Sequence, residues 1–252
     1  MFPQLYHAHH SHYQEDIPFW LALAAQASGP LLELGCGTGR VLMPLAQAGY
    51  HVMGLDHDLA MLKLLRSNSS VNGEVIPPLI ASDMRRFGLA AKFHLVILPC
   101  NTFSTLNENE RKGCLKCIQM CLLPGGVFAL SMPNPRALSG LPALSEAELE
   151  DEFLHPQTGN PVQVSSSWKR VKDTFTVTWY YDHLLPDGQV TRLVSTAVHH
   201  IASLDTYLSE IHDAGFSVAE VYGDFDRSRY ADDSPHCIIT SVRSSYAPRY
   251  EY

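Results

Sequence analysis

The stretch Leu31-Leu-Glu-Leu-Gly-Cys-Gly-Thr-Gly39 decides the fold of this chain. Residues 31–34 have the length and apolar character of a buried strand, and the glycines that follow predict a tight turn into a helix over Val41 to Ala48. A strand that turns directly into a helix brings backbone amides to the edge of an open α/β sheet, where ligands bind. The stretch therefore predicts a ligand site within an α/β fold.

The same alternation of strands and helices continues along the chain. Further strands are expected at 52–55, 79–81, 93–98 and 127–132, with helices at 58–65 and 108–122. This order predicts parallel crossover units, and thus a doubly wound, Rossmann-like sheet with helices on both faces. A helix at 204–214 and strands at 216–222 and 236–242 would complete it with an antiparallel closing strand.

An insertion with period-two character interrupts this pattern. Val171 to Tyr181 and Val190 to Ile201 alternate around the turn Pro186-Asp-Gly188, which predicts an antiparallel β excursion. One side of the first segment is expected to carry Val171, Phe175, Val177, Trp179 and Tyr181. The predicted division is an N-terminal helical cover at 1–29, a core at 30–135 and 203–243, an inserted lid or substrate region at 136–202, and a loose tail from 244 to 252.

Composition limits the class of protein. The chain has 252 residues and a net charge of −8, and this excess of acid disfavours a nucleic-acid partner. The longest apolar run near the start, Phe19 to Ala25, is too short to cross a membrane. Six scattered cysteines are unlike a disulfide scaffold, and Cys114, Cys117 and Cys121 have the spacing of a helix core. We expect a cytoplasmic protein, and the sequence does not indicate its oligomeric state.

The spacing of the glycines distinguishes between two kinds of ligand. A dinucleotide fingerprint requires G-x-G-x-x-G, whereas Gly35, Gly37 and Gly39 give G-x-G-x-G. The carboxylate of Glu33 would also repel a pyrophosphate and suits a ligand with a positive charge.

Two more acidic residues follow neighbouring strands. Asp56 lies 21 positions after Gly35, the spacing expected of a carboxylate that binds ribose hydroxyls in a nucleotide or a nucleoside. Asp83 could accept a hydrogen bond from an adenine amine, while Met61 and Met84 would give soft apolar contacts to the ring.

These motifs together resemble those of the class I S-adenosylmethionine-dependent methyltransferases of small-molecule type. The matching segments are residues 31–39, 52–62, 81–84, 93–98 and 122–126. The resemblance implies that Gly35 and Gly37 line the methionine end of the cofactor, and that Glu33 orients its ammonium group through water. It also implies that Asp56 holds the ribose and that Asp83 with Met84 reads the adenine. Asp58 departs from the serine of many relatives, but either residue can cap the helix.

The full set of candidate site residues follows from these motifs and their neighbours. For S-adenosylmethionine they are Tyr13, Glu33, Gly35, Cys36, Gly37, Asp56, His57, Met61, Asp83, Met84 and Cys100. For the acceptor they are Asn101, Tyr181 and His200. No metal site is predicted, and no catalytic residue can be chosen. Tyr6 is a further candidate for closing over the cofactor.

The resulting prediction is transfer of a methyl group from S-adenosylmethionine to a small acceptor by in-line displacement, with nitrogen preferred over oxygen. A hydroxyl acceptor would need a base, for which His199, His200 and Tyr13 are candidates. Two alternatives remain open: a regulatory protein that binds the same cofactor without turnover, and a nicotinamide-dependent oxidoreductase.

Overall fold

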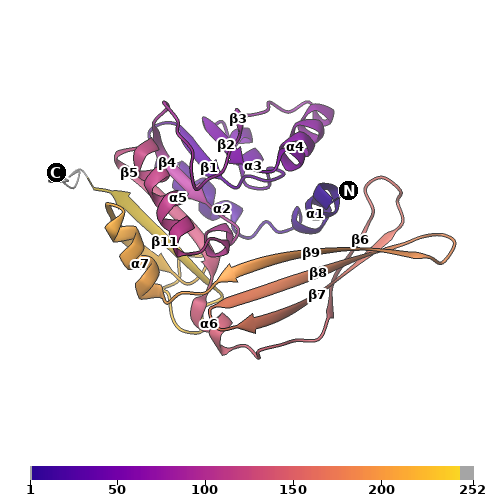
Figure 1. The fold of residues 1–252 in the computed structure, drawn as a ribbon. Helices are drawn as coiled ribbons and strands as arrows, with labels where there is room; N and C mark the ends of the chain where they lie inside the picture. Colours follow the sequence, from indigo (N-terminus) through magenta and orange to yellow (C-terminus); the bar gives the residue numbers. More distant parts are fainter. Residues whose placement is uncertain (1, 245–252) are drawn as a thin grey trace.

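The computed structural model describes residues 2–244, which form a main sheet covered by helices and a second, smaller sheet (Figure 1). Most of the tail predicted for residues 244–252 lies outside the described residues. Within residues 2–244 no helix combines the length and the apolar character needed to cross a membrane.

The main sheet has seven strands in the order β10-β11-β5-β4-β1-β2-β3. Their bounds are β1 (Leu31–Leu34), β2 (Val52–Asp56), β3 (Leu79–Ala81), β4 (Phe93–Leu98), β5 (Leu122–Pro133), β10 (Phe216–Tyr222) and β11 (His236–Arg243). The five strands β1 to β5 pair in parallel with one another. Strand β11 is antiparallel to both of its neighbours, β5 and β10. The prediction of a mostly parallel, doubly wound sheet with an antiparallel closing strand is confirmed.

Helices cover both faces of this sheet. Their bounds are α2 (Ile17–Ala24), α3 (Leu42–Gln47), α4 (Leu59–Asn72), α5 (Glu108–Cys121) and α7 (Leu204–Asp213). One apolar cluster joins α5 and α7 to the sheet, and a second joins α2, α3 and α4 to the opposite face. Cys114, Cys117 and Cys121 lie in the first cluster, as their helical spacing predicted.

The two ends of α4 show how local sequence sets the length of a helix. The side chain of Asp58 caps α4 by accepting hydrogen bonds from the amides of Ala60 and Met61. Helix α4 continues past the predicted end at Leu65 to Asn72, because its last turns carry polar residues that the apolar periodicity does not detect. It stops at Gly73, whose left-handed φ of 69° suits a glycine.

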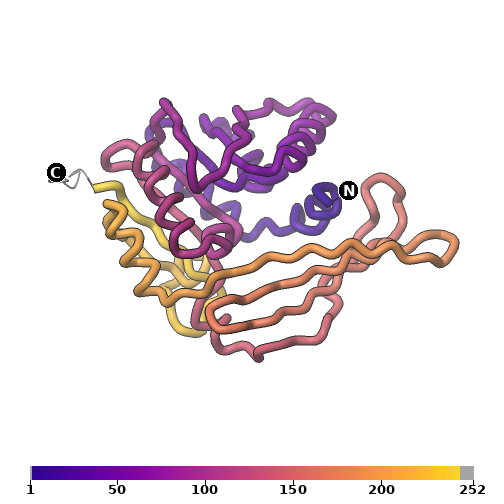
Figure 2. Tube along the Cα trace, viewed as in Figure 1, coloured from indigo at the N-terminus to yellow at the C-terminus, as the bar shows by residue number. Residues whose placement is uncertain are grey.

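The second sheet is inserted between β5 and α7, where the sequence predicted an antiparallel β excursion. Its antiparallel strands are β6 (Glu148–Leu154), β7 (Pro161–Val171), β8 (Thr174–Leu184) and β9 (Val190–His200). Figure 2 shows the chain leaving the core near α6 (Pro135–Gly140), running through this sheet and returning at α7.

Part of the sequence prediction for this sheet was wrong. Val171 ends β7 and does not share a strand with Phe175, because the chain turns at Lys172 and Asp173 before β8 begins. Lys172 adopts a left-handed φ of 51°, and neither turn residue is the glycine or proline by which such turns are usually recognised. Strands β6 and β7 were also missed, although Pro156 and Gly159 mark the loop between them.

A helix that the sequence did not predict, α1 (Phe2–His10), connects the core to the second sheet. It lies between α4 and the second sheet (Figure 1). Its Leu5 is buried against Val162, Val164 and Tyr181 of that sheet.

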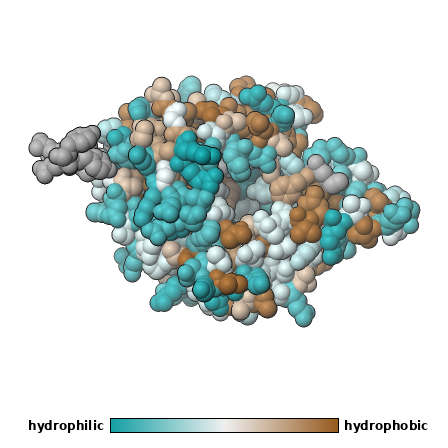
Figure 3. Space-filling model, in the orientation of Figure 1, coloured by the Kyte–Doolittle hydropathy of each residue, from teal (hydrophilic) through white to brown (hydrophobic). Residues whose placement is uncertain are grey.

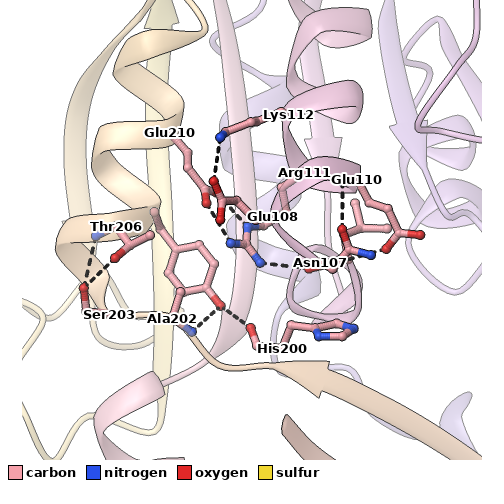
Figure 4. A network of polar contacts seen from close by, with 12 residues as sticks. Asn107, Glu108, Glu110, Arg111, Lys112, His200, Ala202, Ser203, Thr206 and Glu210 are labelled. Carbon is pink, nitrogen blue, oxygen red and sulfur yellow. Dashed lines mark hydrogen bonds and ion pairs between the residues drawn. The ribbon is translucent and has the colours of Figure 1, made fainter. Parts of the chain in front are cut away.

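The return from the second sheet into the core is fixed by a polar network (Figure 4). The hydroxyl of Tyr207 on α7 donates to the carbonyl of His200 at 2.9 Å and accepts from the amide of Ala202 at 3.3 Å. Arg111 of α5 lies over the ring of Tyr207 and forms a buried, two-pronged ion pair with Glu210, at 2.6 and 2.7 Å. Helices α5 and α7 thereby hold the end of β9 in place.

Candidate active site

A cavity of about 1050 Å³ separates the carboxyl ends of the parallel strands from the second sheet and α1. Figure 3 shows this hollow between the core above and the second sheet below. Its volume reaches the upper end of the range found for small-molecule sites, so it has room for a cofactor and an acceptor together.

The glycine turn forms one wall of the cavity. The parallel register sets Leu34 beside Leu55, and the amide of Gly35 donates to the carbonyl of Leu55 at 2.7 Å. Gly35 and Gly37 both line the cavity and have left-handed φ angles of 68° and 52°. A Cβ atom at Gly37 would meet no protein atom within 4 Å, so the backbone here faces open space. A ligand can therefore approach this backbone closely.

Asp56 lies beside the turn, and its carboxylate can accept hydrogen bonds beyond those it already has. Its Oδ2 accepts from the amide of Gly37 and its Oδ1 from the amide of Asp58, each at 2.8 Å. Asp56 is 7% exposed and lines the cavity. Because a carboxylate offers about four lone-pair positions, each oxygen can accept one more hydrogen bond, which fits two neighbouring hydroxyls of a ribose.

Glu33 carries an unsatisfied acceptor. This residue of β1 is 2% exposed, and its Oε2 has no hydrogen-bond partner. Burial raises the pKa of Glu33 well above its usual range, while the positive charge of Arg40 acts in the opposite direction. Glu33 is not among the residues that line the cavity, but an ammonium group acting through water would supply the missing donor. The glycine turn, Asp56 and Glu33 together fit an adenosyl amino acid.

The predicted adenine contacts also line the cavity. Met61 and Met84 are each 8% exposed, and both face it together with Asp83. Asp83 is already engaged, because Nε of Arg85 donates to both of its oxygens at 2.8 and 3.0 Å. These hydrogen bonds lower the pKa of Asp83 to about 2. The carboxylate therefore stays ionised and has fewer free lone pairs for an adenine amine than the sequence suggested.

Strained backbone follows β4 at the cavity wall. Cys100 and Asn101 both adopt left-handed φ angles of 62°, which is unusual for two consecutive residues other than glycine. Ser131 of β5 holds them, since its hydroxyl accepts from the amide of Cys100 and its carbonyl from the amide of Asn101, each at 3.2 Å. Strain of this kind gathers at functional sites, and both residues line the cavity.

An ion pair that sequence reasoning missed fastens the N-terminal segment over the glycine turn. Arg40 donates to both oxygens of Asp16, at 2.5 and 2.7 Å, and to the carbonyl of Tyr13 at 2.8 Å. Its guanidinium also lies over the ring of Tyr13, 5.0 Å from the centroid. Arg40 and Asp16 are 24 positions apart on separate elements, so no local pattern indicates the pair. Tyr13, a predicted cofactor residue, lines the cavity.

Tyr181 belongs to the opposite wall. It lines the cavity, and its hydroxyl is bonded to Nδ1 of His9 at 3.1 Å. Nε2 of His9 lies 3.4 Å from a carboxylate oxygen of Glu150. This chain of contacts joins α1 to two strands of the second sheet.

The structure brings His199, and not the predicted His200, to the cavity. Neighbouring residues of a strand point to opposite faces, and the sequence did not indicate which of the two faces the core. His199 is buried, and its Nδ1 lies 2.8 Å from the hydroxyl of Ser104.

Cys36 and His57, two more predicted cofactor residues, lie apart from the centre of the site. Cys36 is buried and is absent from the cavity wall, because its Sγ fills the space beside the missing side chain of Gly54. His57 lines the rim with a side chain that is 80% exposed.

The inner faces of β8 and β9 supply most of the acceptor side of the cavity. We call these lining residues the roof: Phe175, Val177, Trp179, Tyr181, Ser195, Ala197 and His199. The alternation in the sequence had placed Phe175, Val177, Trp179 and Tyr181 on one side, and the structure confirms this. Phe2, Tyr6 and His10 of α1 also line the cavity.

Comparison with known proteins shows what part of this chain is similar in sequence to a known family. Residues 31–126 match a family model described as a methyltransferase domain. The cypemycin N-terminal methyltransferase of a Streptomyces species is 33% identical over 109 residues, which are 42% of each chain. The matched segment spans less than half the length of the curated relatives.

Solved structures extend the similarity to almost the whole fold. An S-adenosylmethionine-dependent methyltransferase from Clostridium acetobutylicum superimposes with a TM-score of 0.82 at 14% identity, covering 97% of this chain and 98% of the other. CalS10 from Micromonospora echinaspora, an amino pentose methyltransferase solved with bound S-adenosylmethionine, gives 0.70 at 22% identity and covers 96% and 97%. Residues 31–126 are thus similar to a methyltransferase domain, and the chain has the fold of the S-adenosylmethionine-dependent methyltransferases.

Proposed function

We propose that this protein transfers the methyl group of S-adenosylmethionine to a small-molecule acceptor, with nitrogen preferred over oxygen. The observation that carries the proposal is that the glycine turn and Asp56 meet at one wall of a cavity whose other wall is a separate sheet. One cavity therefore offers a cofactor side and an acceptor side.

The residues of the cofactor side have complementary tasks in this proposal. When bound, S-adenosylmethionine supplies a methyl group activated by a positively charged sulfur. Gly35 and Gly37 leave room for the methionine portion, Glu33 orients its ammonium through water, and Asp56 accepts from the ribose hydroxyls. Met61 and Met84 pack on the base, and Asp83, Cys100 and Tyr13 complete the enclosure.

The acceptor side has to align a lone pair with the methyl group and exclude water. The roof and α1 cover the cavity and so perform the second task. Nitrogen is the preferred acceptor because the lining groups are poor bases for a hydroxyl. Burial lowers the pKa of His10 to about 4 and also lowers that of His199, while it raises the pKa of Tyr6 to about 12. A neutral amine needs no such base. In this proposal Asn101 and Tyr181, which both line the cavity, contact the acceptor.

A binding and turnover experiment tests the proposal. Thermal unfolding is measured with S-adenosylmethionine, S-adenosylhomocysteine and NAD, followed by mass spectrometry of small amines and phenols incubated with S-adenosylmethionine. A ligand at 100 times its dissociation constant stabilises the protein by about 2.7 kcal/mol. We expect both sulfur nucleosides to raise the melting temperature and amines to gain a methyl group.

The other outcomes identify the alternative functions. Stabilisation by NAD alone would indicate an oxidoreductase, and cofactor binding without any methyl transfer would indicate a regulatory protein. The proposal includes a cytoplasmic location, supported by six free cysteines, and no nucleic-acid partner, supported by the excess of acid.

A further inference from the structure

We propose that the acceptor is an amine with an apolar, largely aromatic body and without a phosphate, sulfate or carboxylate group. This inference rests on the proposed function and deepens it by naming the substrate class. It follows from the roof, from the pairing of the arginines at the cavity, and from the balance of charge around it.

The roof suits an apolar body. Phe175, Trp179 and Tyr181 bring aromatic side chains to the acceptor side, with Val177 and Ala197 beside them. None of the seven roof residues carries a carboxylate, an ammonium or a guanidinium group. An amine that binds in its cationic form gains from aromatic ring faces, and it releases one proton to solvent before its lone pair attacks the methyl group. An anionic group, in contrast, finds no counter-ion among these side chains.

The two arginines that line the cavity are already paired. Arg40 has both ends of its guanidinium engaged, with the carboxylate of Asp16 and with Sγ of Cys100 at 2.7 Å. Arg85 donates to Asp83 and to Glu110. A phosphate is bound in proteins chiefly through free guanidinium or ammonium donors, and binding one here would require breaking an existing ion pair.

The charge around the cavity favours a cation. Against these two arginines stand six lining carboxylates: Glu15, Asp16, Asp56, Asp58, Asp83 and Glu110. S-adenosylmethionine itself carries a net positive charge, yet the carboxylates remain in excess when it is added. An anionic acceptor would therefore enter a negative field in a partly desolvated space.

Matched pairs of small molecules test this inference on the full chain loaded with S-adenosylhomocysteine. Tryptamine is compared with tryptophan, which adds one carboxylate, and tyramine with O-phosphotyramine, which adds one phosphate. Calorimetry and ligand-detected NMR measure binding. We expect the member without the anion to bind at least about tenfold more tightly in each pair, about 1.4 kcal/mol or more.

A charge introduced into the roof gives an independent readout. Ser195→Arg places a guanidinium beside Trp179, its partner in the register of β8 and β9, and should raise the affinity for O-phosphotyramine about tenfold or more. Thr191→Arg is the matched control, because Thr191 lies on the same strand with the same parity but outside the cavity wall. It should leave that affinity unchanged.

The inference is overturned if the wild-type protein binds tryptophan or O-phosphotyramine as tightly as its amine partner. It is also overturned if S-adenosylhomocysteine binds but neither amine does. Failure of the proposed function looks different: S-adenosylhomocysteine itself would not bind, or an amine that binds would receive no methyl group from S-adenosylmethionine.

Discussion

Oδ2 of Asp56 accepts a hydrogen bond from the amide of Gly37 at 2.8 Å. This bond connects the end of β2 to the glycine turn after β1, two segments that the parallel register brings side by side. It fixes the carboxylate against the cavity wall while leaving lone pairs free, so the residue proposed to bind the ribose is held in place before the ligand arrives.

Replacing Asp56 by asparagine should weaken cofactor binding more than it weakens the fold. A hydrogen bond to a charged group contributes about 1.5–3 kcal/mol, so we expect the dissociation constant of S-adenosylhomocysteine to rise about 10- to 150-fold in calorimetry. Asp213→Asn, at an exposed position on α7, is the control for loss of one negative charge. Equal affinity of the two variants would contradict a role for Asp56 at the ribose.

Two glycine substitutions separate backbone strain from blockage of the site. Gly37 and Gly49 both have positive φ angles, 52° and 88°, and a Cβ at either would meet no protein atom within 4 Å. Only Gly37 lines the cavity. Alanine at either position should cost about 1–2 kcal/mol of unfolding free energy in urea titrations.

Only Gly37→Ala should also reduce the affinity for S-adenosylhomocysteine, because its methyl group would occupy space needed by the ligand. If Gly49→Ala reduces that affinity equally, the effect comes from backbone strain and the cavity wall is not the binding surface.

The buried ion pair between Arg111 and Glu210 should be essential for stability. Glu210→Leu leaves a guanidinium without its partner where side chains are only 4–6% exposed, and should lower the unfolding free energy by about 3–5 kcal/mol. The double variant Arg111→Met with Glu210→Leu should be more stable than this single variant, since no charge is left unpaired. Glu108→Gln, in an exposed pair with Lys112, should change stability by no more than about 1 kcal/mol. If Glu210→Leu lowers the unfolding free energy by no more than Glu108→Gln does, the buried ion pair is not essential for stability.

The stability of the fold should fall in mild acid, in part because of His10. Burial, followed by the neighbouring charge of His9, lowers the pKa of His10 from 6.5 to about 4. The unfolded chain therefore takes up a proton more readily than the folded one. This contribution to stability is fully present above pH 6.5 and is lost as the pH falls towards 4, by at most about 1.4 kcal/mol per pH unit.

His10→Gln should reduce the pH dependence of the unfolding free energy between pH 6.5 and 4, as followed by urea titrations. His212→Gln is the control, because the His212 side chain is 79% exposed. Parallel curves for wild type and His10→Gln would show that His10 titrates alike in the folded and unfolded chains.

Local patterns in the sequence were sufficient for the core. The apolar run of β1, the glycines after it and the alternating strands and helices each depend on neighbours within a few residues, so their structure could be predicted without tertiary information. The same holds for Asp56, because the apolar run of residues 52–55 places it at the end of β2. Helix α1 and the turn at Lys172 had no comparable signal, and both were missed.

The sequence by itself determined the order of strands and helices, the glycine turn and the carboxylates at the strand ends, because short-range periodicity and backbone sterics govern these features. Tertiary structure alone decided that Arg40 meets Asp16, that Arg85 meets Glu110, and that His199 instead of His200 faces the cavity. These depend on how separate elements pack and on which face of a strand is buried, and neither is encoded within any short stretch of the chain.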